Sequence, residues 1–169
     1  MIGTKIYKKD MSKYTECAVW ANENNAQIVD KGEYYEVVAI PAPSLDEAKQ
    51  TKLLKVDQWT ASKITGGFTS SCTGSLVKYD SDKDTQITMQ GIGLNADSIP
   101  KYYPKGIPVR GYEQGNDYKT VLMLTPAQLM HWLADLSLHI GQCKQQGWQK
   151  QAEVNACKTI EELNAIEVM

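Results

Sequence analysis

The sequence predicts an α+β fold with a small front module, a helical connector and a larger C-terminal module. Apolar residues recur every three to four positions in several segments, which is the helical period. Short runs of β-branched and aromatic residues between turn-forming residues predict strands. Clusters of proline and glycine interrupt these patterns and divide the chain into three parts, residues 1–43, 44–66 and 67–169.

The front module is expected to be a helix followed by a hairpin. Apolar residues at helical spacing from Tyr14 to Ala21 predict a short helix, with Ser12 as its N-cap and its end within residues 22–25. Two strands are predicted next, at 26–30 and 34–40. Pro41 lacks a backbone N–H and is expected to end the second strand.

The connector is expected to be a single helix. Ser44 and Glu47 have the spacing of a capping box, in which each side chain binds the backbone N–H of the other residue. An apolar stripe continues from Leu45 to Trp59, and the pair Gly66-Gly67 ends the segment. Such a helix is expected to pack on a neighbouring element through one face.

The C-terminal module is predicted to combine a β-hairpin with helices, one of them long. Hairpin strands at 68–72 and 76–79 are followed by a helix over 82–90, a loop rich in proline and glycine over 99–118, and a strand over 119–124. Thr125 and Pro126 are typical of the N-cap and first residue of a helix, here the longest in the chain. Thr159 and Glu162 predict a second capping box before a short terminal helix.

The long helix contains an apolar seam whose members are separated alternately by four and three residues. This spacing is typical of helices that pack along their length against other helices. We interpret the connector and the seam as candidate association surfaces, and the seam residues as Leu129, Leu133, Leu136 and Ile140.

Composition excludes several classes of protein. The chain has 18 Lys and Arg against 20 Asp and Glu, and this net charge of -2 provides no electrostatic attraction to nucleic acid or to an anionic membrane. The longest aliphatic run, 121–124, is far shorter than the roughly 20 residues of a membrane span, and the first residues lack the apolar core of a signal peptide. The four cysteines are widely spaced and are expected to be packing residues in a reducing cytoplasm.

The sequence offers few candidates for a metal site or for catalysis. Three aspartates between Asp80 and Asp84 resemble the start of a calcium loop, but Thr85 and Gly91 replace the glycine and glutamate that the loop requires. We therefore interpret them as the start of a helix.

His139 and Cys143 lie one helical turn apart, but a zinc site needs further ligands that the sequence does not indicate. Nucleophile elbows, phosphate-binding loops and dinucleotide-binding fingerprints are missing from the sequence. We therefore expect no catalytic residues, no metal and no cofactor, and the chain is not expected to be an enzyme.

Four tyrosines fall within the expected 99–118 loop, namely Tyr102, Tyr103, Tyr112 and Tyr118. Exposed tyrosine provides rigid, amphipathic contact area that suits recognition of proteins or sugars. The alternative is that these rings pack the loop onto the helices. The functional hypothesis is that they contact a partner or a receptor.

Two stretches of the chain resemble bacteriophage and prophage tail proteins. The first, YTECAVWANENNAQIVDKGEYYEVVAIPAPSLDEAKQTKL, is similar to a tail-protein module with the patterns W-x-N-x-N and GEYYEVV-x-IP before a charged helix. The second comprises GGFTSSCTGSLVKYDSDKDTQITMQG and LTPAQLMHWLADLSLHIGQCKQQGWQKQAEVNACKTIEELNAIEV, and is similar to an uncharacterised domain at the C-terminal ends of tail-fibre-associated proteins. Members of that family usually have an aromatic residue shortly after the hairpin phenylalanine, in the region where this chain has Ser70.

The resemblance implies a non-enzymatic role in a phage tail. The chain would be a minor tail or tail-fibre component of the virion, or a tail-fibre assembly chaperone in the cytoplasm of the host bacterium. Either role implies other phage tail proteins as partners, including the tail fibre, and tail symmetry implies a homo-oligomer, either a trimer or a dimer. A stand-alone ligand-binding or regulatory protein is the alternative from another class.

Overall fold

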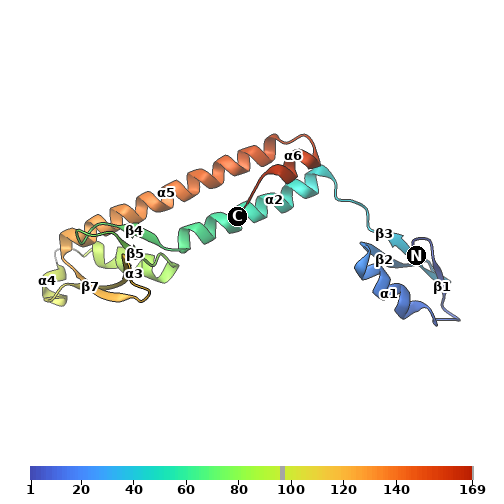
Figure 1. Cartoon of the computed structure of the whole chain (residues 1–169), viewed down its shortest axis with the longest axis horizontal. Helices are drawn as coiled ribbons and strands as arrows, with labels where there is room; N and C mark the ends of the chain where they lie inside the picture. The colour runs from blue at the N-terminus through green and yellow to red at the C-terminus, as the bar shows by residue number, and fades with distance from the viewer. Residues whose placement is uncertain (96–97, 169) are drawn as a thin grey trace. The chain divides into compact units, whose positions relative to one another are not determined.

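A computed structural model of the chain, which describes residues 1–95 and 98–168, confirms the α+β class (Figure 1). The chain divides into two compact units, Met1–Ser44 and Leu45–Met169. Each unit has its own antiparallel sheet and its own cluster of buried side chains.

The first unit packs one helix on a three-stranded sheet. Strands β1 (Lys5–Tyr7), β2 (Ala26–Asp30) and β3 (Tyr34–Ala39) pair in the order β1-β3-β2, and helix α1 spans Tyr14–Glu23. The helix and the β2–β3 hairpin are confirmed as predicted. The core consists of side chains from all four elements, namely Ile6, Cys17, Ala21, Ala26 and Val37.

Two features of this unit differ from the sequence prediction. Ser12 is not the N-cap, because α1 begins after Lys13, which forms no side-chain cap. The N–H of Ser12 instead donates to Asp10 Oδ1 at 3.1 Å, so residues 10–12 form a turn before the helix. Strand β1 has three residues and one buried side chain, Ile6, which is too short for an alternating pattern to predict it.

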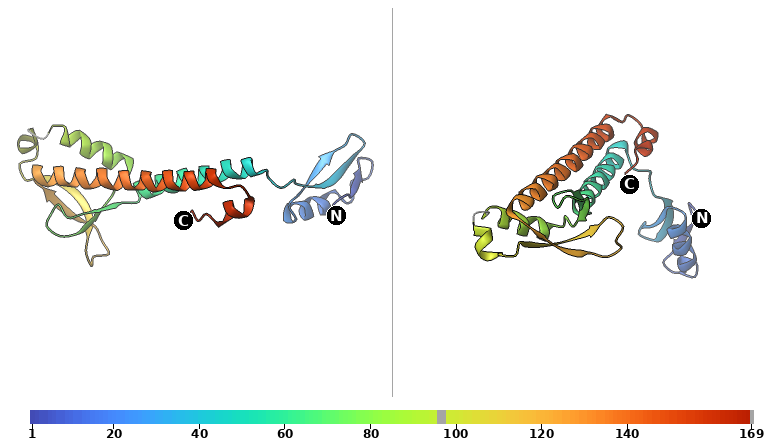
Figure 2. Two further views of the ribbon diagram at one scale, coloured as in Figure 1. Left: turned by 90° about the horizontal axis from the view of Figure 1, so that it is seen from above. Right: turned by 60° about the vertical axis from the view of Figure 1, so that its left-hand side comes forward.

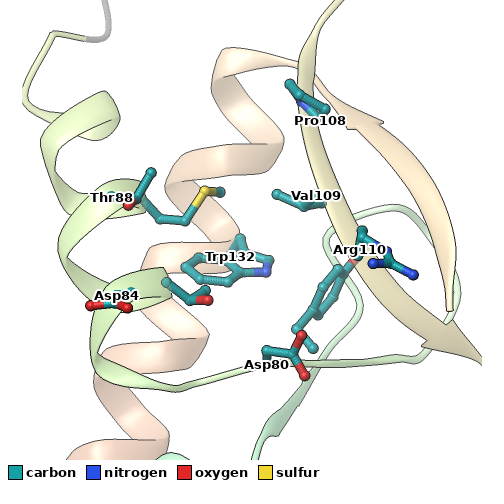
Figure 3. A pocket seen from close by; sticks show the side chains of 10 residues that line it. Asp80, Asp84, Thr88, Pro108, Val109, Arg110 and Trp132 are labelled. Carbon is teal, nitrogen blue, oxygen red and sulfur yellow. The ribbon is translucent and has the colours of Figure 1, made fainter.

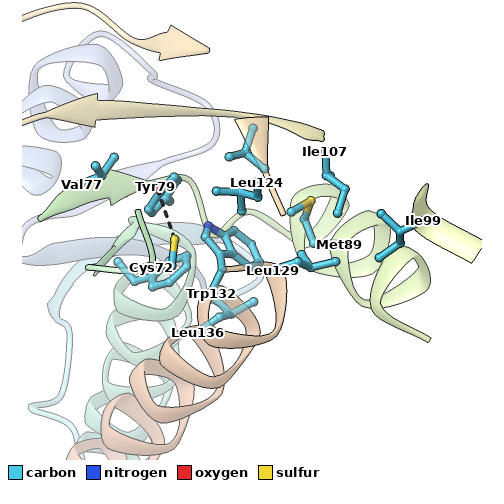
Figure 4. Close-up of a cluster of buried hydrophobic side chains, with 12 residues drawn as sticks. Cys72, Val77, Tyr79, Met89, Ile99, Ile107, Leu124, Leu129, Trp132 and Leu136 are labelled. Carbon is cyan, nitrogen blue, oxygen red and sulfur yellow. Dashed lines mark hydrogen bonds between the residues drawn. The ribbon is translucent and has the colours of Figure 1, made fainter. Parts of the chain in front are cut away.

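The second unit contains a four-stranded antiparallel sheet covered by helices. Strands β4 (Phe68–Ser70), β5 (Val77–Tyr79), β6 (Ile107–Glu113) and β7 (Thr120–Leu124) lie in the order β4-β5-β6-β7. The helices are α2 (Leu45–Thr65), α3 (Lys83–Gly93), α4 (Ile99–Tyr102), α5 (Pro126–Ala156) and α6 (Ile160–Ala165). The N-terminal half of α5 covers one face of the sheet, and Figure 4 shows Trp132, Leu129 and Leu136 of α5 in the core that forms there.

The C-terminal half of α5 pairs with α2, which runs antiparallel to it (Figure 2). Val56 of α2 and Val154 of α5 are fully buried in a second core of this unit. A Cβ atom on Gly147 of α5 would lie only 2.4 Å from Thr60 Oγ1, so glycine is required where α5 passes Thr60 of α2. Segment 44–66 is therefore helical and packs on one face as expected, but it packs within the second unit.

The expectation of a loop over residues 99–118 is wrong, because the segment contains α4 and the seven-residue strand β6. In β6, Ile107 and Val109 face the core while Pro108 points outward. Pro108 lies beyond the end of β5, which pairs with β6 only from Gly111 onward, so its missing N–H interrupts no pairing with β5. A Cβ atom on Gly111 would lie 2.5 Å from Val77 Cγ1, so this glycine permits close strand packing.

Both N-caps predicted for the C-terminal helices are confirmed. Thr125 Oγ1 accepts from the N–H of Gln128 at 3.3 Å, and Gln128 Oε1 accepts from the N–H of Thr125 at 2.9 Å. Thr159 Oγ1 likewise accepts from the N–H of Glu162 at 3.2 Å, but the Glu162 carboxylate accepts from the N–H of Lys158 at 2.6 Å. Within the described part of the chain, every helix is too short or too polar to cross a bilayer.

Gly147→Ala tests the close approach of α2 and α5. The added methyl group would overlap with Thr60, and overpacking of this kind costs roughly 1–3 kcal/mol. We expect a lower free energy of unfolding in urea and partial recovery in the double variant Gly147→Ala/Thr60→Ala. Gly91→Ala in α3, where an added Cβ meets no heavy atom within 4 Å, is the matched control and should not destabilise the protein.

Candidate functional site

A cavity of about 330 Å³ lies between α3 and β6 in the second unit, and α5 forms its floor. Figure 3 shows Asp84 and Thr88 projecting from α3, Val109 and Arg110 from β6, and Trp132 between them. The remaining lining residues are Tyr79, Asp80, Thr85, Met89 and Pro108. The cavity therefore has an apolar floor and a rim with charges of both signs.

The acidic side of the rim is partly neutralised by Lys119. Lys119 Nζ donates to both carboxylate oxygens of Asp80, at 2.8 and 2.6 Å, and this bond raises the pKa of Lys119. The same ammonium group lies 5.4 Å from the ring centroid of Tyr112. Asp80 is therefore held as an ion pair rather than as a free base.

The aspartates between Asp80 and Asp84 begin a helix, α3, as predicted. Asp82 is the N-cap of α3, with Oδ1 accepting from the N–H of Thr85 at 2.9 Å and Oδ2 from its hydroxyl at 2.6 Å. These bonds lower the pKa of the Asp82 carboxyl. Among the described residues, no group of three or more His, Cys, Asp or Glu side chains has the geometry to hold a metal ion.

Ser81, between two of these aspartates, fixes the position of the rim. Its side chain is fully buried; the hydroxyl donates to the carbonyl of Ile64 at 2.5 Å and accepts from the N–H of Gly67 at 2.9 Å. Its own carbonyl accepts from the Gln86 side chain at 2.7 Å. One serine thus connects the end of α2, the start of β4 and the start of α3. Sequence patterns do not reveal it, because a lone serine between aspartates is typical of a solvated turn.

The indole of Trp132 belongs to the core as much as to the cavity. It packs edge-on against Phe68, with ring centroids 4.9 Å apart, and against Tyr79, with centroids 6.0 Å apart. Its Nε1 atom is buried and, among the described residues, lacks a hydrogen-bond partner. Figure 4 shows this nitrogen on the side of the ring nearer Tyr79.

His139 and Cys143 are brought together on one face of α5. Cys143 Sγ lies 3.8 Å from His139 Nε2, which is itself 3.1 Å from the carbonyl oxygen of Lys63. Cys143 is only 6% exposed, and burial raises the pKa of its thiol. A nucleophilic cysteine requires the opposite shift, toward the thiolate.

The four candidate tyrosines do not form one site. Tyr102 and Tyr103 lie at the end of α4, whereas Tyr112 and Tyr118 lie at the opposite end of β6, about 20 Å away at the usual rise per strand residue. Tyr102 and Tyr118 are 68% and 66% exposed and Tyr112 is 38% exposed. Tyr103 packs against the core instead, and with Tyr102 it borders a groove of about 510 Å³.

The seam on α5 is occupied within the chain. Leu129 and Leu136 are 0% and 1% exposed, and Leu133 and Ile140 pack against the same core. Their regular spacing reflects packing of α5 on the sheet and on its neighbouring helices. The side chains of Leu129 and Leu136 are therefore not available to a partner, whereas Leu133 and Ile140 are only partly buried and their role in association stays a prediction.

Comparison with known proteins assigns the second unit to a family. Residues 47–168 match a domain of unknown function, DUF4376, over more than half of the chain. The chain belongs to the DUF4376 family. Neither a curated protein nor a solved structure matches the chain significantly.

The DUF4376 match begins within α2 and continues through α6, so it includes α2 together with the sheet. In this DUF4376 domain, the cavity combines an apolar floor with a charged rim, on which Asp80 is engaged in an ion pair with Lys119. The apolar floor suits binding of an apolar group.

Ser81→Ala tests whether the serine organises the domain. Removing the hydroxyl leaves the N–H of Gly67 and the carbonyl of Ile64 without this partner, and an unsatisfied buried group costs about 1–3 kcal/mol. We expect a matching loss of unfolding free energy in urea. The exposed Ser71→Ala is the control, and an equal effect of both substitutions would contradict the assignment.

Proposed function

We propose that the protein is a non-enzymatic phage or prophage tail protein that acts through contacts with other proteins. The observation that supports this role most directly is the resemblance of both units to tail-associated sequences: W-x-N-x-N and GEYYEVV-x-IP in the first unit and the hairpin-to-helix patterns in the second. The patterns of the first unit lie in the segment from α1 to β3, and those of the second unit lie after α2. The resemblance therefore extends through both compact units.

The chemistry of the described residues is consistent with a binding role. At the cavity, Asp80 is paired with Lys119, the neighbouring Asp82 caps α3, and the four cysteines are buried. The second unit also exposes aromatic and aliphatic side chains to solvent. On the outer face of the sheet these are Tyr112, Val121 and Met123. Side chains of this type contribute strongly to protein interfaces.

The two versions of this role, tail component and assembly chaperone, differ in the final location of the protein. As a minor tail or tail-fibre component it remains in the virion, in contact with other tail proteins. As a tail-fibre assembly chaperone it acts in the host bacterial cytoplasm and is absent from the finished particle.

Deletion of the gene from the phage or prophage that encodes it distinguishes these versions. We expect defective tails and at least a tenfold loss of infectious particles, restored by the gene in trans. Protein mass spectrometry of purified wild-type particles then detects the chain if it is a component and not if it is a chaperone. Normal particle yield and infectivity after deletion would contradict both versions.

The tyrosine pair at the end of β6 provides a more local test. Tyr112→Ser/Tyr118→Ser changes a surface around the Lys119–Asp80 ion pair without removing any core side chain. We expect complementation of the deletion to fall at least tenfold while the circular dichroism spectrum stays unchanged. Tyr102→Ser, at the opposite end of β6, is the matched control. Full activity of the double variant would exclude this pair from partner binding.

A ligand-binding or regulatory protein is the second candidate, favoured by the cavity of about 330 Å³ between α3 and β6. Native mass spectrometry of the protein purified from its own host should then show a bound small molecule. Thr88→Trp, which fills the cavity from α3, should abolish the added mass. Protein without added mass would leave this candidate without support.

A further inference from the structure

The face of α5 opposite its core is unusual for a helix surface in contact with solvent. Seven of its residues recur at steps of four, three, four, four, three and four: Met130, Ala134, Ser137, Gly141, Gln145, Trp148 and Ala152. At about 100° per residue they fall on one narrow side of the helix. All seven are exposed, and we refer to them as the outer stripe.

The outer stripe contains no Asp, Glu, Lys or Arg. Helix α5 has four such residues among its 31, whereas α2 has seven among its 21. Exposed helix faces are normally charged, because polar side chains keep them in water. Instead the stripe exposes 51% of Met130 and 64% of Trp148, and Leu138 beside it is 61% exposed.

Gly141 lies at the centre of α5, fifteen residues from either end. Glycine weakens a helix interior more than any residue except proline, so it is expected only where something requires it. On the inner face, Gly147 has such a reason, because Thr60 of α2 occupies the space of its side chain. On the outer face, a Cβ atom on Gly141 meets no described heavy atom within 4 Å. The fold of the unit therefore gives no reason for this glycine.

We propose that the outer stripe packs against the outer stripe of a second copy of the chain, with the two α5 helices antiparallel and crossing at Gly141. The positions of the stripe are symmetric about Gly141, at distances of four, seven and eleven residues on each side. A two-fold axis at Gly141 therefore brings each stripe residue opposite another stripe residue of the partner.

The antiparallel arrangement is complementary in size. It places Trp148 opposite Ala134 and Met130 opposite Ala152, so that each large side chain meets a small one. A parallel arrangement would instead place Trp148 against Trp148 and Met130 against Met130. The two glycines meet at the crossing, where the absence of side chains permits the closest approach of the helices.

The polar members of the stripe are also complementary. Ser137 faces Gln145 of the second copy, and Ser137 Oγ already donates to the carbonyl of Leu133 at 2.8 Å. Its oxygen is therefore left to accept from the amide of Gln145. A symmetric interface of uncharged residues also brings no like charges together at these positions, which favours a second copy over a charged partner.

The experiment compares the full-length protein with Gly141→Gln by light scattering after size exclusion, over a range of concentrations. We expect the wild type to have twice the 18.9 kDa mass of the chain, and the variant to have at least a tenfold weaker dimer dissociation constant. Glutamine favours helix, so the helix content of the variant should not fall. Gly91→Gln, at an equally open glycine of α3, is the control and should remain dimeric.

Disulfide trapping then tests the orientation. Ala134→Cys mixed with Trp148→Cys should form a mixed disulfide, whereas Ala134→Cys alone should not link to itself. A monomeric wild type, a trimer, a dimer unaffected by Gly141→Gln, or an Ala134→Cys homodisulfide would each overturn the proposal. None of these outcomes bears on the tail assignment, which the gene deletion tests separately.

Discussion

The second unit depends on the burial of one aromatic side chain, Trp132, between a helix and a sheet. Its indole contacts Phe68 of β4 and Tyr79 of β5, and both strands reach α5 through these rings. Loss of a buried aromatic of this size costs roughly 3–5 kcal/mol, a large part of the roughly 5–15 kcal/mol that stabilises a domain. Burial also raises the pKa of Tyr79, so this phenol stays neutral and hydrogen-bonded to Cys72. The same tryptophan forms the cavity floor, so the cavity and the core share their stability.

Much of this fold follows from local sequence. Apolar spacing predicts α1 and α5, and capping residues predict the starts of α5 and α6, because these effects act within one or two helical turns. Strand β6 is not predictable in this way. Its proline and glycine are typical of loops. The strand can contain Pro108 because β5 ends before it, and it contains Gly111 because Val77 of β5 lies close to that position. Those are properties of strand pairing, which a single segment does not contain.

The candidate site shows the same limit. That Asp82 begins a helix follows from sequence, since a cap is a local interaction. Arg110 and Asp84 line one cavity only because α3 and β6 both pack on α5, and no spacing in the chain encodes that. The seam on α5 is predicted correctly as a packing surface, yet its spacing alone does not distinguish packing within the chain from packing between chains. The exposure of the side chains makes that distinction. The seam is largely buried within the chain, whereas the outer stripe on the opposite face of α5 is exposed.

The joint between the units has an evolutionary consequence. Within the described residues, none of the three hydrophobic clusters includes side chains from both units. The DUF4376 match starts at residue 47, shortly after the two prolines at 41 and 43. Recombination at this joint would therefore exchange one front unit for another without opening either core. A gene organised in this way can acquire a different N-terminal unit while keeping the same C-terminal domain.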